Sequence, residues 1–218
     1  MNLIDPDFRK RFDDALGSGD MFALFERTRE AIEQFPDDPD ARYLQALAMA
    51  RLGDPHAALR IYERNRVEEI GTEDGLGLRG RLPKDLATRA DGEKRIDLFR
   101  QSSQAYRLAY QVSDGYFSGI NAATTSLLAG DDEEARRLAT AIGERSDIAN
   151  PRDYYAAASA PEAMLVRGEV ENPTALFDAA RHRPDASPGN VASTARQVRL
   201  IANRLLIPDE QCERLLAA

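Results

Sequence analysis

The chain has 218 residues, 43% of them hydrophobic, and its 37 acidic and 29 basic side chains give a net charge of −8. This composition supports one elongated unit with a real core, while the negative charge disfavours nucleic acid and anionic lipid as partners. The single cysteine, Cys212, excludes an intrachain disulfide, and no stretch approaches the roughly 20 apolar residues of a membrane span, so we expect a cytoplasmic protein with no membrane partner.

Helix starts are marked by prolines that follow a side chain able to cap a helix. The capping side chain accepts a hydrogen bond from an otherwise unpaired N–H group, and proline loses nothing at the first helical position. Gly-Asp pairs supply the matching stops, because glycine adopts the left-handed conformation after a helix and aspartate caps the next one. The capping dipeptides are Asp5-Pro6, Asp38-Pro39, Asp54-Pro55, Asn150-Pro151, Asn172-Pro173 and Ser187-Pro188, and the Gly-Asp pairs are Gly19-Asp20, Gly53-Asp54 and Gly130-Asp131.

Between these marks the apolar residues recur with helical spacing, and no segment alternates as a strand would. The sequence therefore predicts an all-α fold of about twelve helices. Their expected ranges are 6–17, 21–34, 39–52, 55–66, 73–89, 93–112, 116–129, 132–145, 151–167, 173–182, 188–205 and 209–217.

A repeat of 34 residues separates Gly19 from Gly53, which is the tetratricopeptide period. Small residues fit that register, because Ala46 and Ala58 stand where two helices of a hairpin would cross closely. We predict a tetratricopeptide-like solenoid of helical hairpins that forms a single domain over residues 1–218. Its expected units are about 1–36, 37–70, 71–114, 115–149 and 150–185, followed by closing helices over 186–218.

The concave surface of such a superhelix is formed by the first helix of each hairpin and binds extended or helical peptides. Arg51 offers a charge that would pair with an acidic group of a ligand. Two alternatives remain open: the apolar members pack against neighbouring hairpins, and Asn121 makes a structural hydrogen bond. The predicted partner-binding residues are Tyr43, Leu47, Arg51, Phe117, Asn121, Thr124, Tyr154 and Tyr155.

No pattern predicts a catalytic, cofactor or metal site. The glycines between Gly75 and Gly80 spell GxGxxG, but they lack the strand and downstream acid of a dinucleotide site, so we interpret them as close helix packing. His56 and His182 have no neighbouring ligands. The four carboxylates at 131–134 point in different directions on a helix and are expected to form a capped helix start.

Several segments from residue 73 onward are more specific than a generic helical repeat: residues 73–85, Ala105-Tyr106, 115–123, Leu128-Ala129-Gly130, Asp153-Tyr154-Tyr155 and 193–199. Through these segments residues 40–205 resemble the TRAFs-binding region, the tetratricopeptide-like central regulatory part of apoptosis signal-regulating kinases, which has similar segments in bacterial signalling proteins. Pro83 and Pro161 depart from the expected helical pattern and predict kinked or broken helices. The heavy use of arginine and alanine, with only three lysines, is typical of a GC-rich bacterial genome.

This resemblance implies a scaffold that holds protein partners and tunes an attached output domain, such as a kinase or nucleotide cyclase. The sequence itself contains no such output segment. We therefore expect a non-catalytic protein-interaction module. Two other functions remain open: an enzyme built from scattered carboxylates and tyrosines, and a homo-oligomer that associates through the ends of the array.

Overall fold

The structure is a computed structural model that describes residues 5–171 and 173–217. Over these residues the chain is helical throughout and contains no strand, which confirms the all-α prediction. Thirteen α-helices and one 3-10 helix are present in the described part of the chain, one α-helix more than expected. They are α1 (Pro6–Ser18), α2 (Met21–Gln34), α3 (Pro39–Arg51), α4 (Pro55–Arg64), η1 (Val67–Ile70), α5 (Glu73–Ala87), α6 (Gly92–Ser113), α7 (Tyr116–Leu128), α8 (Asp132–Gly143), α9 (Ser146–Ala149), α10 (Tyr154–Val166), α11 (Pro173–Arg181), α12 (Pro188–Leu205) and α13 (Asp209–Ala217).

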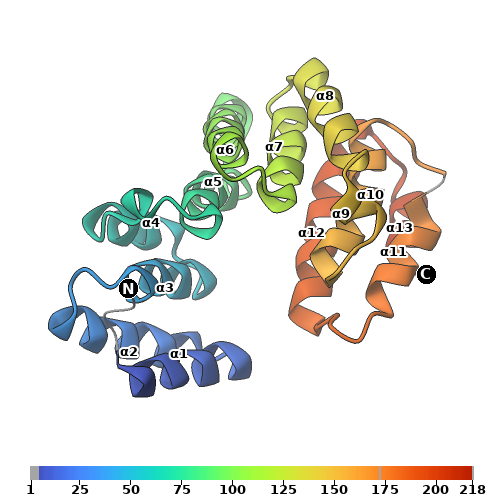
Figure 1. The fold of residues 1–218 in the computed structure, drawn as a ribbon. Helices are drawn as coiled ribbons and strands as arrows, with labels where there is room; N and C mark the ends of the chain where they lie inside the picture. The colour runs from blue at the N-terminus through green and yellow to red at the C-terminus, as the bar shows by residue number, and fades with distance from the viewer. Residues whose placement is uncertain (1–4, 172, 218) are drawn as a thin grey trace.

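Consecutive helices pack as hairpins, and the hairpins stack into an arch (Figure 1). The chain climbs from α1 and α2 through α5 and α6 to α8 at the top of the view, then descends to the group from α10 to α13. The first helix of each hairpin, from α3 to α12, lies toward the inside of the arch. None of the helices in the two described stretches is both long and apolar enough to cross a membrane.

The predicted caps form at four of the six capping dipeptides. The side chains of Asp5, Asp38, Asp54 and Ser187 each accept an N–H from the first turn of the following helix. The glycine stops are also confirmed, because Gly19, Gly53 and Gly130 have φ angles of 73°, 93° and 88°.

The start predicted at Asn150-Pro151 is wrong, because the helix begins at Tyr154 instead. Asp153 is the actual cap and accepts the Ala156 N–H at 2.9 Å. Asn150 instead ends α9, a short helix that the sequence analysis did not predict. The segment between α9 and α10 is held by a side chain from beyond α11, since the carbonyls of Pro151 and Arg152 accept hydrogen bonds from Arg183. The cap predicted at Asn172 lies outside the described residues.

Proline does not break α5 or α10, so of the two predicted outcomes, a kink or a break, the structure excludes the break. Pro83 lies inside α5 and Pro161 inside α10, and both helices continue past them. Both rings are buried, and this burial offsets part of the cost of the backbone hydrogen bond that proline cannot donate.

The core is divided between the two arms of the arch. The two largest clusters of buried residues run from Phe12 to Leu82 and from Tyr106 to Leu215, and two smaller clusters lie beside them. Ala46 and Ala58, which the repeat placed at a close crossing, are both 0% exposed. Small side chains at such crossings let α3 and α4 approach closely.

Asp38 provides a test of how strongly a cap stabilises the arch. Its side chain is 0% exposed and accepts the Ala41 N–H at 2.8 Å. Asp38→Ala should lower the free energy of unfolding by about 1–2 kcal/mol, because the buried N–H loses its partner. Urea unfolding measures this loss. Asp5→Ala, at the exposed cap of α1, is the control and should cost less; equal losses would contradict the role of burial.

Candidate functional site

A cleft of about 640 Å³ lies on the inside of the arch. Its walls come from α3, α5, α7, α10 and α12, the first helices of successive hairpins. Paired contacts show that neighbouring walls run parallel, since Tyr116 meets Asp153 near the starts of α7 and α10 while Thr124 meets Glu162 farther along. This volume is in the range of cavities that bind small ligands or short peptide segments.

Seven of the eight predicted partner-binding residues line this cleft: Tyr43, Leu47, Arg51, Phe117, Asn121, Tyr154 and Tyr155. The eighth, Thr124, lies beneath the surface and is 0% exposed. Its hydroxyl donates to the carboxylate of Glu162 at 2.6 Å. The fold therefore brings seven residues from three predicted units to one place, while contact with a partner stays a prediction.

Aromatic side chains form one wall. The rings of Phe117 and Tyr155 pack edge to face with their centroids 6.1 Å apart, and Tyr154 and Tyr155 pack in the same manner at 5.3 Å. The Tyr155 hydroxyl donates to Asn190 of α12 at 3.0 Å. These contacts hold the wall rigid, and such edge-to-face pairs stabilise beyond the apolar area that they bury.

A polar network forms the floor of the cleft. Lys84 of α5 donates to Asn121 of α7 at 2.7 Å and to Gln197 of α12 at 2.8 Å. Gln197 in turn donates to Glu162 of α10 at 2.6 Å, where Thr124 also donates. One network therefore connects four inner helices. The predicted alternative for Asn121, a structural hydrogen bond, is present here because its amide also donates to the Phe117 carbonyl at 2.9 Å.

Burial shifts the charges on this floor in opposite directions. It lowers the pKa of Lys84 to about 8, although the negative charges of Asp85 and Glu162 counteract it. Burial also raises the pKa of Glu162, while hydrogen bonds from Thr124 and Gln197 and the charge of Lys84 counteract that shift. Desolvation disfavours the charged form of each group. The hydrogen bonds and opposite charges of the network replace part of the stabilisation that water would give to charged Lys84 and Glu162.

Helix α12 closes one end of the cleft. It lies beside α10 in parallel, because Tyr155 bonds to Asn190 and Glu162 bonds to Gln197 at the same offset of 35 residues. The hydrogen bond from Lys84 to Gln197 spans 113 residues of sequence. The array therefore curls tightly enough for its sixth hairpin to touch the third.

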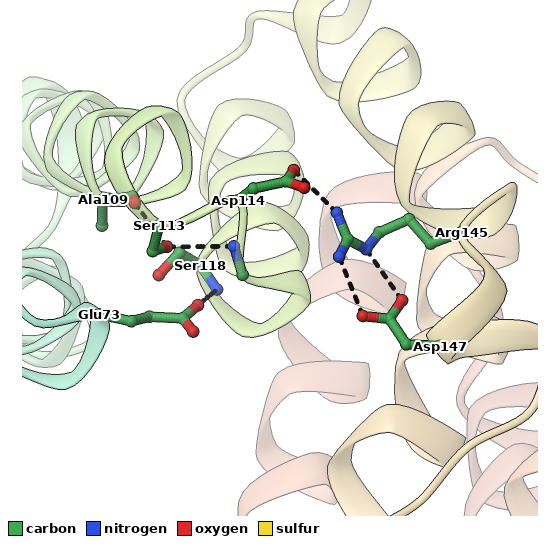
Figure 2. Close-up of polar contacts among 8 residues, drawn as sticks. Glu73, Ala109, Ser113, Asp114, Ser118, Arg145 and Asp147 are labelled. Atoms are coloured by element: carbon green, nitrogen blue, oxygen red, sulfur yellow. Dashed lines mark hydrogen bonds and ion pairs between the residues drawn. The ribbon is translucent and has the colours of Figure 1, made fainter.

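At the edge of the cleft where the helices begin, acidic side chains accept hydrogen bonds from neighbouring helices. Glu73 of α5 accepts the Ser118 N–H at 2.9 Å and so caps the neighbouring helix α7 (Figure 2). A Cβ on Gly115 would lie 2.0 Å from the Glu73 carboxylate, so this approach requires glycine there. The Gly115 and Glu73 positions both belong to the segments that carry the family resemblance.

The turn between α6 and α7 is fixed on the side away from the cleft. Asp114 has a φ of 51° and pairs with Arg145 at 2.9 Å, and Arg145 also pairs with Asp147 (Figure 2). The Ser113 hydroxyl accepts the Gly115 N–H at 3.1 Å. These bonds position the start of α7, where Tyr116 and Phe117 enter the cleft.

Of the charged members of the site, sequence analysis predicted Arg51 but missed several others and the amide beside them, among them Arg81, Lys84, Glu162, Arg196 and Gln197. Residues 81–84 and 196–197 fall inside segments that carried the family resemblance, which was the available signal. Glu162 follows Pro161 in a helix that the sequence predicted to kink. Only the curl of the array brings these residues together.

The remaining motifs have structural roles. The GxGxxG glycines lie inside α5 rather than after a strand, and Gly80 packs against the Tyr106 ring. Asp131 caps α8 by accepting the Glu134 N–H at 3.3 Å. His182 is exposed and contacts Asp178, while Cys212 is buried. Within residues 5–171 and 173–217, no group of three His, Cys, Asp or Glu side chains is placed to hold a metal ion.

Known structures share this architecture. The crystal structure of TTC0263, a thermophilic TPR protein in Thermus thermophilus, superposes with a TM-score of 0.68 at 15% identity, over 88% of this chain and 98% of that one. The structure of Naa15/Naa10 bound to HypK-THB matches with a TM-score of 0.51 at 11% identity over 96% of this chain, which spans only 32% of that one. At these identities the likeness shows the fold alone.

Sequence comparison gives the family. None of the curated protein sequences is significantly similar to this chain. The model of one family matches residues 19–128, from the first glycine stop to the end of α7. The matched segment includes the repeat of 34 residues and the walls of the cleft formed by α3, α5 and α7. The chain belongs to the TPR-S, or Tetratricopeptide Repeats-Sensor, family.

Proposed function

We propose that this chain is a non-catalytic regulatory module that binds a segment of a protein partner in the inner cleft. The observation that carries the proposal is the convergence of aromatic, apolar and arginine side chains from five helices on one cleft of about 640 Å³. The TPR fold supports it, because the first helices of such arrays form recognition surfaces. The chain would act in the cytoplasm.

The resemblance to the central regulatory region of apoptosis signal-regulating kinases supports a more specific role in signalling. In that role the module holds a partner and tunes an output domain that is attached to it or binds to it. The floor network suits such a task, because Lys84 and Gln197 tie the two arms of the arch together beneath the bound segment. A segment entering the cleft would contact both arms at once.

Substitution of cleft aromatics tests the proposal. Tyr43→Ala together with Tyr155→Ala should weaken capture of the partner at least tenfold, because two rings from opposite arms lose their contact. Affinity purification followed by quantitative mass spectrometry measures the loss. The matched control is Phe22→Ala, which truncates an aromatic side chain that is 66% exposed on α2, outside the cleft. Identical partner lists for all three proteins would remove the cleft as the binding site.

A further inference from the structure

Three arginines from separate helices converge in the cleft. Arg51 ends α3, Arg81 lies on α5, and Arg196 lies on α12, which closes the opposite side. They share a neighbour in Tyr155, since burial raises the pKa of its hydroxyl while the charges of Arg51, Arg81 and Arg196 each lower it. Like charges therefore face one another across the cleft, and an anion between them would relieve their repulsion.

Two of these arginines have no internal partner. Among residues 5–171 and 173–217, the side chains of Arg51 and Arg196 make no hydrogen bond or ion pair, and both residues are exposed. Arg81 pairs with Asp85 of its own helix at 3.2 Å. An unpaired arginine keeps all five of its N–H donors available in a planar fork that fits a carboxylate.

Most of the acids that line the cleft are engaged by the fold, whereas Asp74 at the start of α5 has no side-chain hydrogen bond or ion pair among the described residues. Asp153 accepts hydrogen bonds from Tyr116 and from the N–H of Ala156, Asp185 accepts the Tyr154 N–H at 2.6 Å, and Glu73 caps α7. These carboxylates keep their negative charge when they accept N–H and O–H groups, but they lie at or just before the helix starts. Arg51 ends α3, and Arg81 and Arg196 lie beyond the first turns of α5 and α12, so the arginines gather farther along the cleft.

We infer that the cleft recognises an acidic segment of the partner, whose carboxylate side chains are clamped between Arg51, Arg81 and Arg196. This inference rests on the proposed function. The three guanidinium groups come from separate helices, so they suit several carboxylates spaced along a peptide better than one compact anion. Apolar side chains of the same segment pack on Phe117 and Tyr155 between the charged contacts.

A paired selection tests the inference. A library of random decapeptides displayed on phage is selected against the wild type, against Arg51→Glu with Arg196→Glu, and against Arg60→Glu with Arg136→Glu. Arg60 and Arg136 are exposed on α4 and α8 outside the cleft, and both double variants change the net charge by the same amount. Peptides selected by the wild type should be rich in Asp and Glu.

Affinities of the selected peptides provide the magnitude. A fluorescein-labelled peptide should bind the cleft double variant at least tenfold more weakly than the wild type, by fluorescence anisotropy, and bind the control variant with little change. The same peptide with Asn and Gln in place of Asp and Glu should also bind the wild type at least tenfold more weakly. Raised salt should weaken the binding of the acidic peptide more than the binding of the neutral one.

The outcomes separate the inference from the function on which it rests. One outcome is that the selected peptides fail to bind the double variant Tyr43→Ala with Tyr155→Ala and yet carry no excess of Asp and Glu. That result would overturn the inference of an acidic segment and leave the cleft as a binding site. Failure to select any peptide that depends on Tyr43 and Tyr155 would overturn both. If inorganic pyrophosphate raises the thermal midpoint of the wild type, but not of the cleft variant, and no acidic peptide binds, the site takes a small anion and the peptide assignment is wrong.

Discussion

Replacing Gly80 by alanine should lower the free energy of unfolding by about 2–3 kcal/mol, although alanine favours a helix. A Cβ at this position would lie 2.6 Å from two ring atoms of Tyr106, and that side chain is only 1% exposed. The ring must shift toward the cleft that it lines, or α5 and α6 must separate, and either movement disrupts the packing around it. Urea unfolding followed by circular dichroism measures the loss, and the thermal midpoint should fall by about 5–10 °C.

Gly17→Ala is the matched control, because it makes the same substitution where space is free. Gly17 lies within α1, and a Cβ there would meet nothing within 4 Å. This change should stabilise the protein by roughly 0.5–1 kcal/mol through helix propensity alone. If both alanines stabilised the protein alike, the close approach of α5 to Tyr106 would be disproved.

The helices could be predicted from the sequence because their signals are local. Asp38 and Asp54 cap the helices that they precede, and Gly53 takes the left-handed conformation, each within a few residues of the signal. The failure at Asn150-Pro151 has a nonlocal cause. Asp153 competes as a cap, and Arg183 fixes the preceding segment from 31 and 32 residues away. The spacing of residues in the sequence cannot show which of two possible N-caps starts the helix when a side chain far along the chain determines which one is used.

The walls of the cleft were predictable and its floor was not. Tyr43, Leu47 and Arg51 follow helical spacing on α3, so the repeat placed them on one face. Lys84 and Gln197 meet only because the superhelix curls by an amount that small rotations at each hairpin determine. The pattern of residues within a single repeat does not predict the sum of these rotations. The same curl buries Thr124, which the repeat alone placed at the surface.

Lys84 should make the stability of the protein depend on pH in a way that Lys84→Met removes. Burial lowers the pKa of Lys84 to about 8, against 10.5 for the unfolded chain, so the unfolded state binds more protons above pH 7. The free energy of unfolding should therefore rise with pH, by about 1–2 kcal/mol between pH 7 and 9.5 for this group. Lys84→Met lacks this group, so its stability should not show that rise, and the difference between wild type and variant should change with pH by the same amount.

The charged groups around Lys84 are Arg81 and Asp85 on α5, Glu162 on α10 and Arg196 on α12, while α6 and α7 contribute the neutral side chains of Tyr106 and Asn121. Asp85 and Glu162 raise its pKa and the two arginines lower it, and burial outweighs them all. Urea unfolding at intervals from pH 7 to 9.5 measures the two profiles, with Lys94→Met as the control because Lys94 is exposed on α6. Parallel profiles for wild type and Lys84→Met would show that the ammonium is solvated. A gap that widens with pH would show that the fold holds a cation beneath the cleft at a cost in stability, where an acidic ligand benefits from it.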